Sequence, residues 1–404
     1  EAALALAGAD PAQQSQRRAL LQMLLQSASI RCREADTKHW MQQLEASAHT
    51  DLRDTAEVLI ARARLADCRE DYDTQRNEAA SAMALVANDA AALGSWAAAA
   101  EQRGRAELAL GDPAAAATTL RTALARLPDD VAAAPRRLAI RQILLQTVGM
   151  QGDLAAAETI ARENLSLLEA RHGRAPHPNT LAVRGALAAV LFDRGDFAAA
   201  LTEGEHAIAD ATALYGATSP AVSNLRGNRA NALKALGRAA EAEAEYRTAI
   251  AALATAPLEA GNEEQRLIAA FNLLELLNEG ERWQEAHAHG EALLAEAEHV
   301  LGREHIVTLE TRDALGVTAL GRGDAAQAEA LHRDALTAKR KTLGDDSPYT
   351  ASAHHRLGLA LIALHRTEDA RRELEAALAT RRAALGADHP DTRAAAEAVA
   401  RMPR

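Results

Sequence analysis

The sequence predicts an all-α protein built as an elongated array of helical hairpins. The first observation is length, because 404 residues exceed the roughly 250–300 residues that one hydrophobic core usually holds. The second is composition: hydrophobic residues make up 48% but aromatic residues only 2%, and alanine alone is about a quarter of the chain. Such small side chains suit helices that pack closely against one another. The third observation is an internal repeat.

Seven short turn segments mark this repeat in one register. They are Gly111-Asp112-Pro113-Ala114-Ala115-Ala116, Gly152-Asp153-Leu154-Ala155-Ala156-Ala157, Gly195-Asp196-Phe197-Ala198-Ala199-Ala200, Gly237-Arg238-Ala239-Ala240-Glu241-Ala242, Glu281-Arg282-Trp283-Gln284-Glu285-Ala286, Gly323-Asp324-Ala325-Ala326-Gln327-Ala328 and His365-Arg366-Thr367-Glu368-Asp369-Ala370. Their final alanines are separated by 41, 43, 42, 44, 42 and 42 residues. A fixed period in this range indicates a solenoid of stacked units.

Each unit reads as two helices with their own start and stop signals. An apolar stretch with helical spacing, such as Leu225, Ala230 and Leu233, precedes the turn, and glycine ends that helix well where a positive φ is needed. A second helix follows, for example over 240–253. Between units a polar residue comes before proline or a β-branched residue, which is typical of a helix cap. These elements are His177-Pro178-Asn179-Thr180, Ser219-Pro220, His305-Ile306-Val307-Thr308, Ser347-Pro348-Tyr349-Thr350 and His389-Pro390-Asp391-Thr392.

The two ends of the chain match this pattern poorly. Residues 12–48 and 50–87 have the length of a hairpin, but Glu70 stands where the turn glycine is expected and Gln75 replaces the alanine. We expect two degenerate hairpins over 1–90, seven repeats over 91–391 and a capping helix over 392–404. Terminal units of a solenoid are usually atypical because one of their faces meets water.

The repeats resemble the tetratricopeptide repeat, in which a small residue in the first helix precedes an alanine in the second by twelve positions. The pairs Gly104/Ala116, Ala188/Ala200, Ala230/Ala242, Gly316/Ala328 and Gly358/Ala370 fit, whereas Leu145/Ala157 and Leu274/Ala286 keep only the alanine. The period near 42 and the segment Leu385-Gly386-Ala387-Asp388-His389-Pro390-Asp391-Thr392 are similar to the kinesin-light-chain subtype. The resemblance implies a right-handed α–α superhelix of about nine hairpins plus a C-terminal capping helix.

Charge and targeting signals exclude several classes of function. Lys+Arg 45 against Asp+Glu 56 gives a net charge of −11, which argues against nucleic acid or an anionic membrane as partner. Cys32 and Cys68 are too few for a disulfide framework, and we expect both to be inert buried thiols. The start at Glu1 indicates a fragment of a longer chain. Without a signal peptide or a membrane span, we expect a cytoplasmic location, with the periplasm as the alternative if a span lies upstream.

No set of residues predicts catalysis, a cofactor or a metal. His332-Arg333-Asp334 imitates a kinase catalytic loop, but Lys339 stands where asparagine is required. Phosphate-binding and nucleophile-elbow motifs do not occur. The pairs His287/His289 and His354/His355 lack the i,i+4 spacing that places two imidazoles on one face of a helix. We therefore expect no enzyme activity in this fragment, and no catalytic, cofactor-binding or metal-binding residues.

The resemblance implies that first helices line a concave surface where peptides or partner helices lie. On this surface asparagine is unexpected, because it is less favourable than alanine inside a helix, and an amide can donate to and accept from a peptide backbone. We predict that the partner contacts Asn224, Asn228, Asn231, Lys234, Phe271, Asn272, Glu275 and Asn278. The alternative, that these amides only bond neighbouring helices or water, remains open at this stage.

The sequence thus favours a scaffold that binds a protein or peptide in its concave groove. Glu310 and Asp313 lie next to the predicted site, which favours a neutral or basic partner. The alternative is the regulatory region of a larger enzyme or transcriptional regulator, because similar repeats are often fused to bacterial serine/threonine kinases. The usage of alanine and arginine with little lysine is typical of a bacterium of high GC content.

Overall fold

The computed structural model describes residues 11–47, 51–173, 175–256, 261–387 and 389–402. Helices hold 83% of these residues, and none of them lies in a strand. The prediction of an all-α protein is confirmed. The chain divides by its internal contacts into two units, Glu1–Asp196 and Phe197–Arg404, which we call unit 1 and unit 2.

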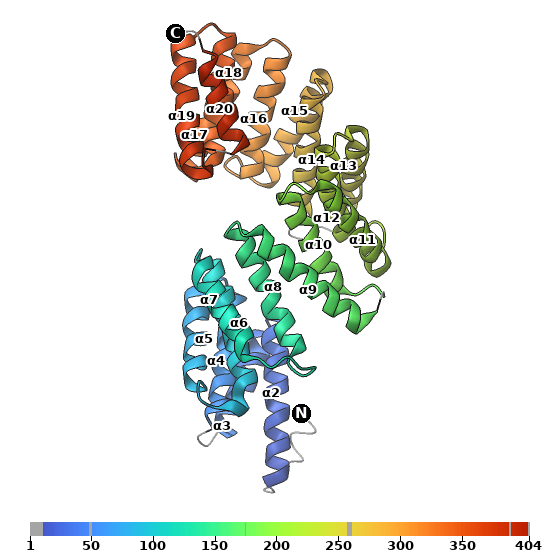
Figure 1. The fold of residues 1–404 in the computed structure, drawn as a ribbon, viewed down its shortest axis with the longest axis vertical. Helices are drawn as coiled ribbons and strands as arrows, with labels where there is room; N and C mark the ends of the chain where they lie inside the picture. The colour runs from blue at the N-terminus through green and yellow to red at the C-terminus, as the bar shows by residue number, and fades with distance from the viewer. Residues whose placement is uncertain (1–10, 48–50, 174, 257–260, 388, 403–404) are drawn as a thin grey trace. The chain divides into compact units, whose positions relative to one another are not determined.

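Unit 1 consists of helices that pack in sequence order, each against the next (Figure 1). They are α2 (Pro11–Ile30), α3 (Glu34–Ser47), α4 (Leu52–Asp67), α5 (Tyr72–Leu85), the short 3-10 helix η1 (Ala90–Ala92), α6 (Leu93–Ala109), α7 (Pro113–Arg126), α8 (Ala134–Met150), α9 (Leu154–His172) and α10 (Pro178–Asp193). The even-numbered helices also contact one another, since α2 touches α4, α4 touches α6, and α6 touches α8. They form one face of the unit.

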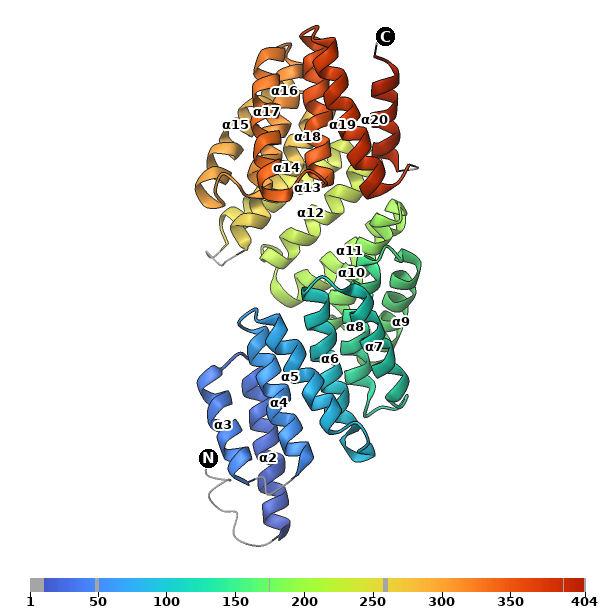
Figure 2. The same ribbon diagram turned by 90° about the vertical axis from the view of Figure 1, so that its left-hand side faces the viewer.

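Unit 2 repeats the same arrangement, as Figure 2 shows from a second side. Its helices are α11 (Phe197–Tyr215), α12 (Pro220–Ala235), α13 (Ala239–Ala254), α14 (Asn262–Glu279), α15 (Trp283–Val300), α16 (Ile306–Gly321), α17 (Ala325–Leu343), α18 (Pro348–Ala363), α19 (Thr367–Leu385) and α20 (Pro390–Ala400). Here α12, α14, α16 and α18 contact one another along a second row. The final helix, α20, packs on α19, and Met402 beyond it enters the same apolar cluster as Leu357 and Leu374.

The turn after each first helix contains one residue with a left-handed backbone. Glycine holds this position in the repeats with a Gly turn, and four non-glycine residues adopt the same conformation elsewhere, including the two degenerate hairpins. The residues are Cys32, Glu70, Gly111, Gly152, Gly195, Gly237, Glu281, Gly323 and His365. The N–H of this residue and the N–H of the next one donate to carbonyls of the preceding helix, as Gly237 does to Lys234 and Arg238 does to Leu233. The turn therefore keeps the same backbone geometry in hairpins that lack the glycine of the repeat motif.

The repeat alanines lie where two helices approach most closely. Ala116, Ala157, Ala242, Ala286, Ala328 and Ala370 are fully buried, and Ala200 is 4% exposed. The paired small residue has the same role: a Cβ added at Gly358 would lie 2.7 Å from Leu374 Cγ, and one added at Gly104 would lie 2.6 Å from Leu120 Cδ2. The alanine spacing seen in the sequence thus reports close helix packing.

The polar residues between units cap the first helices, as the sequence predicts. The Nδ1 atoms of His177, His305 and His389 accept hydrogen bonds from backbone N–H groups two residues later, at 3.2, 3.3 and 3.2 Å. Ser219 and Ser347 accept in the same way through their hydroxyl oxygens. Each cap satisfies an amide that has no partner inside the helix.

Cys32 and Cys68, which are 36 positions apart in the sequence, form a disulfide. The expectation of two inert buried thiols is wrong, because both residues are exposed and bonded to each other. Cys32 lies in the turn of the first hairpin and Cys68 caps the C-terminus of α4 in the second. The turns of neighbouring hairpins lie next to each other on the same side of the stacked helices. Two cysteines that are almost one repeat apart in the sequence therefore come into contact.

Candidate functional site

The residues predicted to bind a partner lie on two neighbouring helices of unit 2. Asn224, Asn228 and Asn231 follow one another at i, i+4 and i+7 along α12, so they share one side of that helix. Phe271, Asn272, Glu275 and Asn278 lie on α14, which contacts α12. Lys234 at the end of α12 forms a 2.6 Å ion pair with Glu279 at the end of α14. We call the surface formed by Asn224, Asn228, Asn231, Phe271 and Asn272 the amide face.

Three amides of this face are not used by the fold. Asn228 is exposed, Asn224 and Asn272 are half-buried, and their side chains form no hydrogen bond with any residue that the structure describes. Phe271 is also half-buried in the same helix turn as Asn272. The surface therefore offers unpaired donors and acceptors beside an accessible aromatic ring.

The other two asparagines of the predicted set have partners inside the protein. Asn231 accepts a 2.5 Å hydrogen bond from the hydroxyl of the buried Tyr246 on α13. Asn278 is 7% exposed; its Nδ2 donates to the carbonyl of Ala314 and its Oδ1 accepts from Thr318, at 3.1 and 2.7 Å. We assign Asn278 to the packing of α14 against α16, since both its Nδ2 and its Oδ1 have partners there.

Glu275 lies on α14 next to the amide face and forms an ion pair with a buried cluster of charged residues. Its Oε1 lies 3.6 Å from a guanidinium nitrogen of Arg356 on α18, and another nitrogen of Arg356 donates to Asp313 at 3.1 Å. Asp313 also accepts from His332 Nδ1 at 2.5 Å and from Lys339 Nζ at 3.0 Å. Lys339 forms a further ion pair of 2.6 Å with Glu310. We call Glu310, Asp313, His332, Lys339 and Arg356 the charge cluster.

Burial and charge act in opposite directions on the two acids of the cluster. Burial alone raises the pKa of Asp313, but the hydrogen bond from His332 and the charges of Arg356 and Lys339 outweigh it and hold that pKa below its usual range. For Glu310 burial prevails, and its pKa lies above the usual range despite Lys339. Both acids are neutralised within the fold, so the argument that they favour a basic partner loses its support.

The charge cluster was not predicted from the sequence, although the sequence carries a signal of it. Ala328, His332, Ala335 and Lys339 recur on one side of α17, which places His332 and Lys339 on the packed face of the helix. Opposite His332 stands Gly316, where an added Cβ would lie 2.5 Å from the imidazole ring. A glycine in the middle of α16 thus makes room for a buried histidine, and the resemblance of His332-Arg333-Asp334 to a kinase motif is accidental.

Within the described residues, no group of three or more His, Cys, Asp or Glu side chains is placed to hold a metal ion. No helix in the described ranges combines the length and apolar character that crossing a membrane requires.

Comparison with known families decides what the repeats are. A tetratricopeptide repeat model matches residues 179–255, and a second tetratricopeptide repeat model matches residues 308–349 and 350–391. These segments are tetratricopeptide repeats. They contain the α12 part of the amide face and the whole charge cluster, whereas α14 lies between the matched segments. No curated protein is a significant match to the chain as a whole.

Solved structures with tetratricopeptide-type folds resemble most of the chain. The apo quorum sensor NprR from B. thuringiensis is 11% identical, with 89% of this chain and 97% of that protein covered and a TM-score of 0.68. The apo form of RapI is 10% identical, with 90% and 97% covered and a TM-score of 0.67. The TPR-like repeats of a kinesin light chain from Podospora anserina are 22% identical, with 51% and 96% covered and a TM-score of 0.45. At these identities the likeness to NprR and RapI establishes the fold alone, and none of the matches supports a link to a kinase.

Proposed function

We propose that this chain is a non-catalytic scaffold that binds a peptide or an extended segment of a partner protein on the amide face. The observation that carries the proposal is the set of three unpaired amides, Asn224, Asn228 and Asn272, on two adjacent first helices. Asparagine is up to about 0.7 kcal/mol less favourable than alanine in a helix interior. An amide that bonds nothing in the fold does not offset this cost, whereas an amide that bonds a ligand backbone does.

The chemistry of the face fits a backbone more than a charged side chain. Each amide can donate to a carbonyl and accept from an N–H at the same time, which gives affinity without strict sequence demand. Lys234 is paired with Glu279, and the nearby acids are neutralised inside the charge cluster. We therefore propose an uncharged segment with an apolar residue directed to Phe271. NprR, which shares the fold, has also been solved in complex with its cognate peptide NprX.

A library of random short peptides selected on the full chain tests this proposal. Peptides recovered from the library should bind the wild type, and the triple variant Asn224→Ala/Asn228→Ala/Asn272→Ala should bind them at least about tenfold more weakly in fluorescence anisotropy. Asn231 and Asn278 are left unchanged because their bonds stabilise the fold. The matched control is Gln284→Ala, which removes an exposed amide of α15 that also has no described partner.

Two results would contradict the proposal. One is selection of peptides whose affinity is equal for the wild type and the triple variant. The other is a loss of affinity in Gln284→Ala as large as in the triple variant, which would place the contact on the second helices.

We further propose that the protein works in an oxidising compartment, because its disulfide is exposed and such bonds persist mainly outside reducing cytosol. This favours the periplasmic alternative over a cytoplasmic location. Alkylation of thiols in intact cells, followed by mass spectrometry, should find Cys32 and Cys68 unmodified until a reductant is added. Alkylation of both cysteines before reduction would contradict this assignment.

A further inference from the structure

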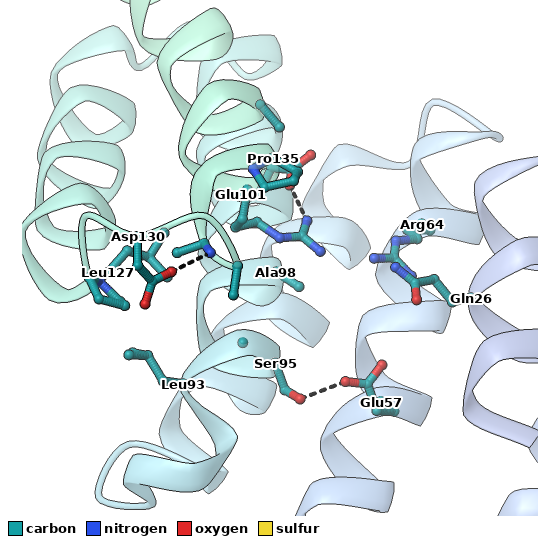
Figure 3. Close-up of a pocket in the computed structure, with 16 residues that line it drawn as sticks. Gln26, Glu57, Arg64, Leu93, Ser95, Ala98, Glu101, Leu127, Asp130 and Pro135 are labelled. Carbon is teal, nitrogen blue, oxygen red and sulfur yellow. Dashed lines mark hydrogen bonds and ion pairs between the residues drawn. The ribbon is translucent and has the colours of Figure 1, made fainter. Parts of the chain in front are cut away.

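A pocket of about 710 Å³ opens on the first helices of unit 1 (Figure 3). Its walls come from α2, α4, α6 and α8 and from the segment between α7 and α8. This volume lies within the roughly 300–1,000 Å³ of small-molecule sites. The pocket belongs to a different unit from the amide face, and none of its residues is part of the proposed peptide site.

Arg64 on α4 is the unusual residue of this pocket. It is only 7% exposed, and its one side-chain hydrogen bond among the described residues is a 3.3 Å bond to the hydroxyl of Ser29. It forms no ion pair with any acid in the described part of the chain. Burial, and then the charge of Arg136, lower its pKa, but an arginine remains protonated in proteins. A buried cation normally has a charged partner, but among the described residues Arg64 has only the more distant charges of Glu57 and Glu101 and no direct ion pair.

The acids nearest to Arg64 are engaged elsewhere. Glu101 on α6 accepts hydrogen bonds from both Arg105 and Arg136. Glu57 on α4 accepts a 2.6 Å bond from the hydroxyl of Ser95. Arg64 therefore keeps most of its five N–H donors for something that enters the pocket.

The two ends of the pocket differ in character. Figure 3 shows Arg64 and Gln26 together at one end, with Leu93 and Leu127 at the opposite end and Ala98 between them. The side-chain amide of Gln26 is exposed and bonds no described residue, so it is available as a further donor. A ligand that spans this pocket meets donors at one end and, at the other, two leucine side chains beside the carboxylate of Asp130, which accepts a hydrogen bond from the N–H of Ala133.

We propose that this pocket binds a small apolar monocarboxylate, with its carboxylate held by Arg64 and Gln26 and its hydrocarbon part against Leu93 and Leu127. A planar carboxylate matches the paired donors of a guanidinium. A single negative charge matches the single positive charge of Arg64. Glu57 and Glu101 would repel a phosphate with two charges more strongly than a singly charged carboxylate.

The disulfide holds the charged end of the pocket in place. Cys68 follows Arg64 by one helical turn, and its N–H donates to the carbonyl of Arg64. Cys32 follows Ser29, the hydrogen-bond partner of Arg64, by three residues. The bond between the two cysteines therefore ties the C-terminal ends of α2 and α4 together where Arg64 and Gln26 meet the ligand.

Binding of 4-methylpentanoate to the full chain, followed by calorimetry and ligand-observed NMR, tests the proposal. The acid should bind, while 4-methylpentanamide, which has the same shape without the charge, and inorganic phosphate should each bind at least about tenfold more weakly. Arg64→Met should reduce the affinity for the acid by about tenfold or more. Its control is Arg62→Met, which removes an exposed arginine of the same helix whose partner is Glu45.

A second variant guards against misfolding of Arg64→Met. Gly94 lines the pocket, and no atom lies within 4 Å of a Cβ added there, so Gly94→Leu should fold normally and fill the space. Gly149→Leu is the matched control, because Gly149 is a helical glycine with equally open surroundings outside the pocket. Affinity should fall by about tenfold in Gly94→Leu and stay unchanged in Gly149→Leu.

The proposal is overturned if 4-methylpentanoate does not bind the wild type, if the amide or phosphate binds as tightly as the acid, or if the folded Gly94→Leu variant keeps wild-type affinity.

Discussion

Asp313 of α16 accepts a 2.5 Å hydrogen bond from Nδ1 of His332 on α17, and both side chains are fully buried. Lys339 and Arg356 add two further donors to the same carboxylate. Helices α16, α17 and α18 thus share one buried acid. A buried ion cluster rarely exceeds a hydrophobic contact in stability, but loss of one member leaves an uncompensated charge.

Gly316→Ala should destabilise unit 2, because the new methyl group would lie 2.5 Å from the imidazole of His332 and would push it away from Asp313. We expect a loss of about 1–3 kcal/mol in the free energy of unfolding, measured with urea. Gly149→Ala is the control, since no atom lies within 4 Å of its added Cβ. It should be neutral or stabilising by up to about 1 kcal/mol. Equal stability of both variants would show that the glycine does not make room for His332.

Leucine at Ala242, Ala328 or Ala370 should overpack the closest approach of two helices. All three alanines are fully buried, so each substitution should cost about 1–3 kcal/mol. Ala244→Leu on the exposed side of α13 provides the control and should change stability little. Thermal melts followed by circular dichroism measure the difference. Three unchanged melting temperatures would contradict the repeat register.

Removal of the disulfide should weaken the N-terminal hairpins. Cys32→Ser opens a loop of 36 residues, for which the loss of chain constraint corresponds to about 3–4 kcal/mol. A reductant should lower the stability of the wild type by a similar amount and leave the variant unaffected. Limited proteolysis should then cut first within α2–α5. Identical unfolding curves with and without reductant would show that the bond does not constrain this region.

The free energy of unfolding should decrease as the pH is lowered, because of His355. Burial, with repulsion from Arg381 and Arg356, lowers the pKa of His355 from 6.5 to about 4. Between about pH 6.5 and pH 4, the unfolded chain therefore binds a proton at His355 that the folded chain does not bind. The stability that the neutral His355 contributes above pH 6.5 is lost progressively as the pH falls to about 4. We expect a loss of about 2 kcal/mol across this interval, since the residue is partly accessible. His355→Leu should remove that part of the slope in urea titrations at several pH values. A slope unchanged in the variant would assign it to another group.

The sequence predicted the hairpins well because their requirements are local. An alanine every 42 residues or so is needed where two consecutive helices cross, and that contact lies within one repeat, as at Ala242 and Ala328. Turn residues and caps are equally local: the left-handed position falls on Glu281 and His365 where glycine is missing, and His177 and His305 cap the helices that follow them. Such features depend on a few neighbouring residues, so one sequence suffices to read them.

The candidate site was predicted only as a surface. Spacing along α12 placed Asn224, Asn228 and Asn231 on one side of the helix, but it could not show which amide has a partner. That depends on Tyr246, fifteen residues beyond Asn231, and for Asn278 on Thr318, forty residues away. Hydrogen bonds over such separations are made by packing between helices, and single-helix periodicity carries no record of them.

The sequence by itself therefore determined the helical class, the repeat period, and which helix is the first in each hairpin, because each of these depends on the spacing of residues close together in the sequence. Only the tertiary structure decided that Cys32 pairs with Cys68, that Asp313 collects His332, Lys339 and Arg356, and that Arg64 is buried in a pocket without an acidic partner in the described chain. Each of these depends on which side chains from different hairpins meet. The stacking of the hairpins determines which side chains come into contact. The properties of a buried charge or thiol then depend on the side chain next to it.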